Sequence, residues 1–224
     1  FFFKQKTAYE ILTCDWSSDV CSSDLVDALS TLAVITGLGW ASGIRLYAVL
    51  FFLGVLQHAG VVELPPDLAL LAHPAVMIVS GLLFLTELFA DKIPGFDSLW
   101  DAVHTFIRIP GGALLAAAAV AQGDPGLALA AGLLGGVFAA GAHFAKASSR
   151  VLINASPEPL SNWAASFGED ALAFGVVWSA FKYPLLLLIG LAIFLLVAVL
   201  LAPRLIRGMR NVVAAVRRLL GHPV

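Results

Sequence analysis

Charged residues are scarce in this chain of 224 residues. Asp, Glu, Lys and Arg make up 12% of the sequence, about half of their share in a typical soluble domain. In contrast, 60% of the residues are hydrophobic and the mean hydropathy is +0.92. This composition excludes a disordered chain and is unusual for a water-soluble fold. We therefore interpret the sequence as an all-α integral membrane protein, a polytopic helical bundle whose main partner is the lipid bilayer.

Cysteine is almost absent, since the chain has only Cys14 and Cys21, and both lie in the polar segment Phe1–Leu25. Two stretches of this segment, KQKTAYEI at residues 4–11 and DWSSDVCSSDL at residues 15–25, resemble one reading frame of a sequencing-library adapter. We therefore predict that residues 1–25 are translated adapter DNA rather than native protein. The remaining sequence has no cysteine and so cannot use disulfide, thiolate–metal or cysteine-nucleophile chemistry.

The common motifs of soluble enzymes are also missing. The sequence has no Gly-x-Ser-x-Gly nucleophile elbow, no Gly-x-x-x-x-Gly-Lys phosphate loop and no His-Glu-x-x-His zinc pair. Its formal net charge is only −2. We expect no cofactor and no nucleic-acid partner, and an enzyme is the less favoured class.

Six apolar stretches are long enough to cross a bilayer as helices, which takes about 20 residues each. They are residues 27–59, 68–91, 97–122, 126–155, 158–181 and 184–202, the third bent at Pro110. Five arginines follow Pro203 in an amphipathic pattern, so the positive-inside rule places the C-terminus in the cytoplasm. We predict one transmembrane domain at residues 26–202, a basic amphipathic cytoplasmic tail at residues 203–224, and six spans with both ends in the cytoplasm.

Two Gly-x-x-x-Gly motifs suggest a division of the spans into halves. Gly39-x-x-x-Gly43 precedes Arg45 in the first span, and Gly132-x-x-x-Gly136 precedes Arg150 in the fourth. A 3+3 inverted repeat, as found in many transporters, would account for the similar motifs in the first and fourth spans. The sixth span, however, has no polar residue to match those of the third. Both glycine motifs also permit close helix approach, which predicts a homo-oligomer through these faces.

Ionisable side chains inside the spans are the main functional candidates, because they are costly in lipid. They recur at helical spacing, which places them on one face of each helix and predicts a shared interior pocket. The predicted substrate or ion pocket comprises Arg45, Glu87, Asp91, Asp97, Asp101, His104, Arg108, His143, Lys146, Arg150, Asn154, Glu158, Asn162, Glu169 and Asp170.

The pocket as predicted has more acids than bases. With Lys92 included, seven carboxylates face five permanent cations, which suggests protonated acids, a protonated histidine or a bound cation. Asp97, Asp101 and His104 share one face and could ligate a divalent cation. Arg108 is an equally good partner for these acids, so the metal hypothesis stays open.

Three classes of function compete. A small-solute or ion transporter or channel, with proton coupling as one option, uses the acids and histidines of the pocket and is our preferred prediction. A membrane-embedded enzyme acting on an anionic or lipid-linked substrate would use Arg108, Lys146 and Arg150 to bind the anion and His104 as acid or base. A non-catalytic scaffold subunit is the third class. A closed, fully salt-bridged pocket favours the scaffold, and a pocket open only to the cytoplasm favours the enzyme.

Three stretches of the chain resemble a known family. They are ADKIPGFDSLWDAVHTFIR at residues 90–108, AKASSR at residues 145–150 and NASPEPLSNW at residues 154–163, with SGIRLY at residues 42–47 fitting the first span. Across residues 26–202 the sequence resembles the domain-of-unknown-function 4126 family of small multi-span bacterial membrane proteins. This resemblance implies a multi-pass protein of the bacterial inner membrane, and it implies no particular activity.

Overall fold

The computed structural model describes residues 18–93, 96–154 and 159–200, and these residues form helices without any strand. The prediction of an all-α fold is thus confirmed for this part of the chain. The elements are α2 (Ser18–His58), the short 3₁₀ helix η1 (Ala69–Ala72), α3 (Pro74–Ala90), α4 (Phe96–Ala118), α5 (Pro125–Asn154) and α6 (Pro159–Lys182). A last apolar helix follows at Pro184–Leu200. Helix α2 begins at Ser18, inside the segment that we attribute to adapter DNA.

The second predicted helix starts later than the hydropathy suggests. Residues 69–72 form the 3₁₀ helix, and α3 begins only at Pro74. The His73 ring accepts a hydrogen bond from the backbone N–H of Ala75 at 3.3 Å, which caps the helix. Pro74 then occupies the first helical position, where its missing N–H has no intrahelical partner to lose. The start predicted at Leu68 was therefore wrong, because capping and not hydropathy sets this boundary.

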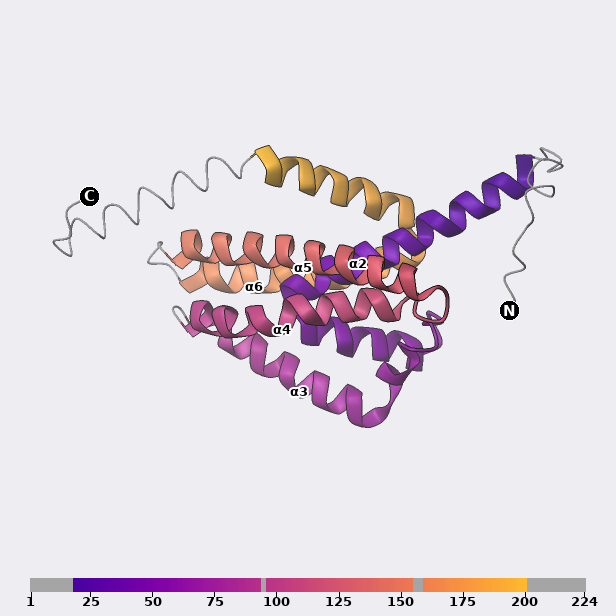
Figure 1. Ribbon diagram of the computed structural model, residues 1–224. Helices are drawn as coiled ribbons and strands as arrows, with labels where there is room; N and C mark the ends of the chain where they lie inside the picture. The colour runs from indigo at the N-terminus through magenta and orange to yellow at the C-terminus, as the bar shows by residue number, and fades with distance from the viewer. Residues whose placement is uncertain (1–17, 94–95, 155–158, 201–224) are drawn as a thin grey trace.

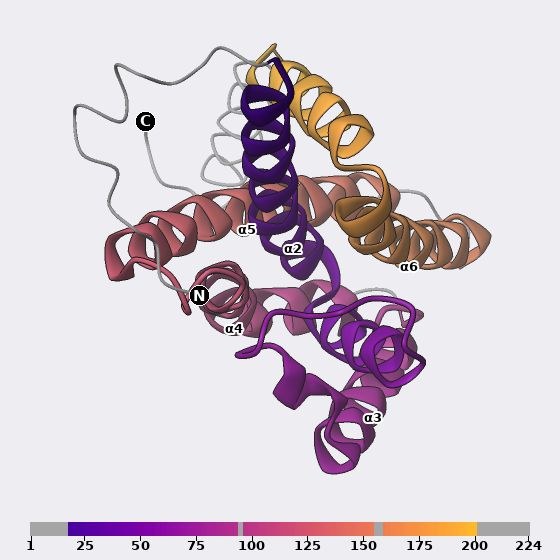
Figure 2. The same ribbon diagram turned by 90° about the vertical axis from the view of Figure 1, so that its right-hand side faces the viewer.

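Helix α2 is broken at Arg45, whose backbone torsions (φ −145°, ψ 73°) are not helical. Its two halves run back toward the same end of the bundle (Figures 1 and 2). Before the break, Gly37 lies against Ala180 near the end of α6. At the break, Arg45 reaches Ser166 near the start of α6.

After the break, the second half of α2 runs back along α6 toward the end of that helix. Phe52 packs on Phe174 of α6, with ring centroids 4.8 Å apart, and Lys182 at the end of α6 donates to the Val61 carbonyl oxygen at 3.2 Å. The length of the first apolar stretch allowed a tilted or a broken helix, and the structure has the broken one. Composition cannot distinguish a long straight helix from two short ones that meet at a break.

Glycines bring α2 into backbone contact with its neighbours α4 and α5. A Cβ atom on Gly39 would lie 2.6 Å from the Gly135 Cα atom, and one on Gly43 would collide with the Ala139 carbonyl. Gly132 and Gly136 of the second motif face α4. Both Gly-x-x-x-Gly motifs thus pack inside the chain, and the predicted homo-oligomer stays a prediction that needs another surface. The inverted repeat likewise stays a prediction.

The outer surface of the bundle is strongly apolar. Phe106 of α4 is 82% exposed and Leu114 is 71% exposed, and large apolar side chains are also exposed along α3, α5, α6 and the last helix. Two helical stretches, Leu25–His58 and Pro125–Arg150, are long and apolar enough to cross a membrane. Pro74–Ala90 and Pro184–Leu200 are apolar but shorter. The interior, in contrast, contains charged side chains.

Candidate functional site: a buried charged cluster beside an apolar cavity

Arg45 lies at the break of α2 and binds residues from two other helices. Its guanidinium is fully buried and lies 2.8 Å from an Asp91 carboxylate oxygen and 2.9 Å from an Asp170 oxygen. It also donates to the hydroxyl oxygen of Ser166 at 2.8 Å. At the break, the Arg45 side chain extends into the space between α3 and α6. Arg45 is therefore the centre of a cluster to which five helices contribute.

Helices α3 and α4 supply carboxylates and a second arginine. Glu87 and Asp91 lie one helical turn apart on the inward face of α3 and are both fully buried. Arg108 of α4 bridges Glu87 and Asp101 through its two terminal nitrogens. Asp101 and Arg108 are two turns apart on the same face of α4, so helix geometry alone brings them together.

Helix α5 supplies two more cations. The ammonium group of Lys146 lies within 3.3–3.4 Å of carboxylate oxygens of Asp91, Asp101 and Glu169. Arg150 makes a bidentate contact with Glu169, at 2.9 and 2.7 Å. Such paired bonds are among the strongest and most directional ion pairs in proteins. The cations of α5 thus hold α3, α4 and α6 in one cluster.

The charges of this cluster do not balance. Among the described side chains it contains five carboxylates and four permanent cations. One oxygen each of Glu87, Asp91 and Asp101 is buried and has no hydrogen-bond partner in the described structure. A buried carboxylate oxygen without a donor is costly. One further positive charge, a proton or a cation, would balance the described charges, although a proton on one carboxylate would satisfy only one of these oxygens. Guanidinium nitrogens of Arg45 and Arg108 also lack a hydrogen-bond partner in the described structure.

The two histidines lie on different sides of the cluster. His143 Nε2 is 2.7 Å from the Thr105 hydroxyl and its Nδ1 is 3.5 Å from an Arg108 nitrogen, so it extends the cluster. His104 instead stacks on Trp100 at 4.1 Å between ring centroids and bonds the Trp100 carbonyl oxygen. Within the described residues it makes no hydrogen bond or ion pair with a carboxylate, so it lies on an aromatic side of the cluster, and its role in the pocket stays a prediction.

The structure brings most of the predicted pocket together. The residues that it unites are Arg45, Glu87, Asp91, Asp101, Arg108, His143, Lys146, Arg150, Glu169 and Asp170. Asp97, Asn154, Glu158 and Asn162 lie outside the described side chains. Lys92, which we counted among the cations, instead lies over the rings of Trp163 and Phe167. Its charge is thus separate from the cluster.

Sequence reasoning missed Ser166 and Thr105, which bond Arg45 and His143. A signal was present, because Ser166 lies one turn before Glu169 and Asp170 on the same face of α6. Hydroxyl residues are common in apolar helices, however, so this pattern alone is weakly informative. Within the described residues no group of His, Cys, Asp and Glu has the arrangement of a metal site. Asp101 is held by Arg108 and Lys146 instead.

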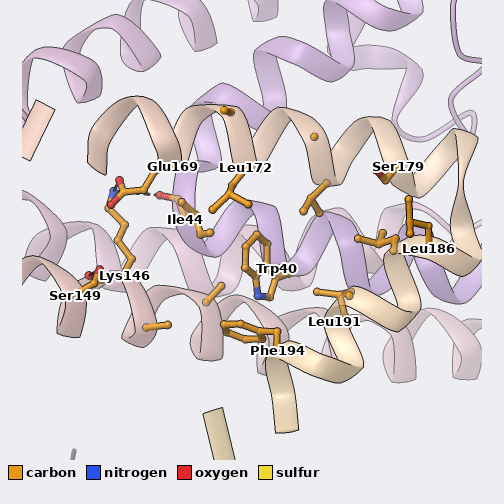
Figure 3. A pocket seen from close by; sticks show the side chains of 17 residues that line it. Trp40, Ile44, Lys146, Ser149, Glu169, Leu172, Ser179, Leu186, Leu191 and Phe194 are labelled. Carbon is orange, nitrogen blue, oxygen red and sulfur yellow. Dashed lines mark hydrogen bonds and ion pairs between the residues drawn. The ribbon is translucent and has the colours of Figure 1, made fainter. Parts of the chain in front are cut away.

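A cavity of about 800 Å³ adjoins the cluster (Figure 3). Its walls come from the first half of α2, from α5, α6 and the last helix, and are almost entirely apolar. At one end lie Lys146, Ser149 and Glu169, of which Lys146 and Glu169 also belong to the charged cluster. The lining residues Leu172 and Leu186 are more than half exposed, so the cavity opens sideways out of the bundle.

These features define a helical bundle with an apolar exterior and a charged, partly unsatisfied interior. The family model described as Domain of unknown function (DUF4126) matches residues 32–204. The chain belongs to this family, as its sequence motifs predicted. The match begins after the segment that we attribute to adapter DNA. Neither a curated protein nor a solved structure matches the chain.

Proposed function

We propose that this chain is a multi-span protein of the bacterial inner membrane that moves a small solute or ion across the bilayer through its charged cluster. The distribution of polarity supports the membrane location. Charged side chains lie inside the bundle, and phenylalanine and leucine side chains cover its outside. Water would favour the opposite arrangement, whereas lipid cannot hydrogen-bond the charged groups and so favours this one.

Helices α3 to α6 and the last helix would then cross the membrane, and α2 would enter and return as a re-entrant pair. This arrangement puts the start of α2 on the face opposite the end of the last helix, whereas the sequence predicted six spans with both ends in the cytoplasm. Helices α4 and α6 carry acidic and basic residues, but these face the cluster and not the lipid. The end of α3, the start of α4 and the end of the last helix lie at the same end of the bundle (Figure 1). By the positive-inside rule, the basic sequence after residue 203 supports a cytoplasmic location for that end.

One observation carries the transport proposal. A broken helix places Arg45 inside a cluster that has one carboxylate too many and three buried oxygens without donors. Broken helices form substrate and ion sites in many transporters. Here the break lies toward the end of the bundle where α3 ends, because Arg45 pairs with Asp91, the residue that directly follows α3. A site that needs one more positive charge suits a proton or a monovalent cation, taken up on one side and released on the other.

The contacts do not favour the enzyme that the sequence allowed. Arg108 and Arg150 are each bonded to carboxylates, and Lys146 is surrounded by them, so an anionic substrate would have to displace acids. His104 is stacked on Trp100 and is not placed beside these cations. A purely structural network would be closed and satisfied, whereas Glu169 opens onto the cavity and three oxygens lack partners.

The test is ion flux in proteoliposomes that carry a pH dye, with a potassium diffusion potential as driving force. We expect the parent protein to accelerate proton entry above that of protein-free vesicles. Glu169→Gln, which neutralises the carboxylate between cluster and cavity, should abolish the acceleration. Glu63→Gln, the same change at an exposed site outside the cluster, should leave it intact. A parent that accelerates neither protons nor sodium nor potassium contradicts the proposal.

A further inference from the structure

We propose that the cavity beside the cluster binds a lipophilic monovalent organic cation, with its positive charge toward Glu169 and its apolar groups between α5, α6 and the last helix. This inference rests on the proposed function, for which it names the class of substrate. It is carried by the shape of the cavity, the charge at one end and the exposed mouth.

The cavity has the size and lining of a site for a small organic molecule. About 800 Å³ lies within the usual range of ligand pockets, which are mostly apolar with a few polar groups at defined positions. Leu187, Leu191 and Phe194 of the last helix form one wall. A hydrated inorganic ion gains nothing from such walls, whereas an apolar body of drug-like size would displace water or lipid from them.

The charge at the polar end selects for a cation. Glu169 is 12% exposed in its side chain and is the one carboxylate of the described cluster that lines the cavity. Lys146 lies at the same end, but its side chain is 1% exposed and its ammonium group already faces several carboxylates. Arg150 already holds Glu169 in a bidentate pair, so the preference for a cation comes from the one negative charge that the described cluster has in excess.

Trp40 adds an aromatic ring and a buried donor to the lining of the cavity, and it packs edge-on against Phe194 with ring centroids 5.3 Å apart. This residue lines the cavity, is 7% exposed, and its indole N–H has no hydrogen-bond partner in the described structure. Figure 3 places its ring in the middle of the cavity, between Glu169 at one end and Leu186 at the other. An aromatic ring or a hydrogen-bond acceptor on the ligand would satisfy this donor.

The mouth of the cavity indicates the route of entry. Its rim includes Leu172, Leu186 and Gly190, which are exposed on the apolar side of the bundle. In the proposed membrane this side faces the acyl chains. A lipophilic cation partitions into the bilayer and would reach Glu169 from there, without crossing the charged cluster first.

The experiment measures equilibrium binding of tetraphenylphosphonium to the purified full-length chain in detergent. Tetraphenylborate has nearly the same size and shape with the opposite charge and serves as the control ligand. We expect saturable binding of tetraphenylphosphonium and at least about tenfold weaker binding of tetraphenylborate. Glu169→Gln should weaken tetraphenylphosphonium binding by about tenfold or more and reduce the preference between the two ions.

A second variant keeps the test valid if Glu169→Gln fails to fold. Gly190 lines the cavity and a Cβ atom there would meet nothing within 4 Å, so Gly190→Leu fills the cavity without a clash and should abolish binding. Gly141 has equally open surroundings but lies outside the cavity, so Gly141→Leu should bind as the parent does. Equal binding of both ions, or unchanged binding by Gly190→Leu, overturns the inference.

Binding and flux separate this inference from the proposed function. Proton flux without tetraphenylphosphonium binding would contradict the proposed cation site in the cavity and would still support the proposed transport function. Binding without flux of protons, sodium or potassium would contradict the proposed transport function and would support a membrane protein that binds an organic cation. Saturable, charge-selective binding that Gly190→Leu abolishes supports the inference whatever the flux result.

Discussion

The ammonium nitrogen of Lys146 lies 3.2 Å from the carbonyl oxygen of Ile44, the residue that directly precedes the break in α2. A helix break interrupts the backbone ladder, and a charged donor from a neighbouring helix can compensate a backbone acceptor there. One side chain thus holds the break and also binds three carboxylates of the cluster. The shape of α2 and the charge of the cluster are therefore linked.

Lys146→Met should destabilise the protein strongly. The change removes the donor to Ile44 and raises the excess of carboxylates from one to two, at a cost of about 3 to 5 kcal/mol. Lys92→Met is the matched control, because Lys92 contacts aromatic rings outside the cluster and should cost about 1 kcal/mol. Thermal unfolding in detergent measures both. Equal losses from the two variants would count against a central role for Lys146.

Removing a cation from the cluster should cost more than removing an acid. Asp101→Asn brings carboxylates and permanent cations into balance, whereas Arg108→Gln leaves both Asp101 and Glu87 with one partner fewer. We expect a loss of about 1 to 3 kcal/mol for Asp101→Asn and about 3 to 5 kcal/mol for Arg108→Gln. The double variant should be more stable than Arg108→Gln alone. Chemical denaturation of the three purified variants checks the order, and the reverse order would contradict the charge count.

Both ends of α2 should be accessible from the same side of the membrane. In a chain whose Cys14 and Cys21 are replaced by serine, cysteines at Val26 and His58 should react with an impermeant thiol reagent from one face. A cysteine at Ile93, at the end of α3, should react from the opposite face. Labelling of intact and permeabilised cells distinguishes the faces. Reaction of positions 26 and 58 from opposite faces would show a straight first span.

Gly43→Ala and Gly141→Ala should have opposite effects on stability. A methyl group at Gly43 meets the backbone of Ala139, which cannot move aside, so we expect a loss of about 1 to 3 kcal/mol. At Gly141 nothing lies within 4 Å, and alanine should add up to about 1 kcal/mol by its helix propensity. Unfolding temperatures in the same detergent give the comparison. A stabilising Gly43→Ala would mean that α2 and α5 are farther apart than described.

His104→Phe should leave ion flux unchanged, while His143→Phe should reduce it. The first substitution keeps the stack on Trp100 and removes no contact of the ion-pair cluster. The second removes the ring nitrogens that contact Thr105 and Arg108. The proteoliposome assay for proton entry measures both. Loss of flux in His104→Phe would return this histidine to the set of pocket residues.

The sequence predicts the charged cluster well because helical spacing fixes which residues share a face. Glu87 with Asp91, and Asp101 with Arg108, follow from multiples of one turn, and lipid leaves such groups only the interior. The break at Arg45 could not be predicted in this way. Neither proline nor a run of polar residues marks it, and it depends on partners that lie far along the chain.

The cavity also could not be predicted from the sequence. It lies between α5 and α6, and the first half of α2 and the last helix complete its walls. Apolar residues such as Leu187 and Leu191 have the same periodicity whether they face lipid or line a cavity. Only the relative placement of the helices distinguishes the two.

The distance along the chain between Arg45 and its partners sets an order of assembly. Ser166 and Asp170 are synthesised more than 120 residues after Arg45, yet they bind its guanidinium directly. Until α6 is made, the nascent chain lacks these partners, and an arginine buried without them is unfavourable. Helix α2 therefore has its full set of contacts only after α6 is made, and a chain truncated before α6 keeps Asp91 as a partner of Arg45 but lacks Ser166 and Asp170.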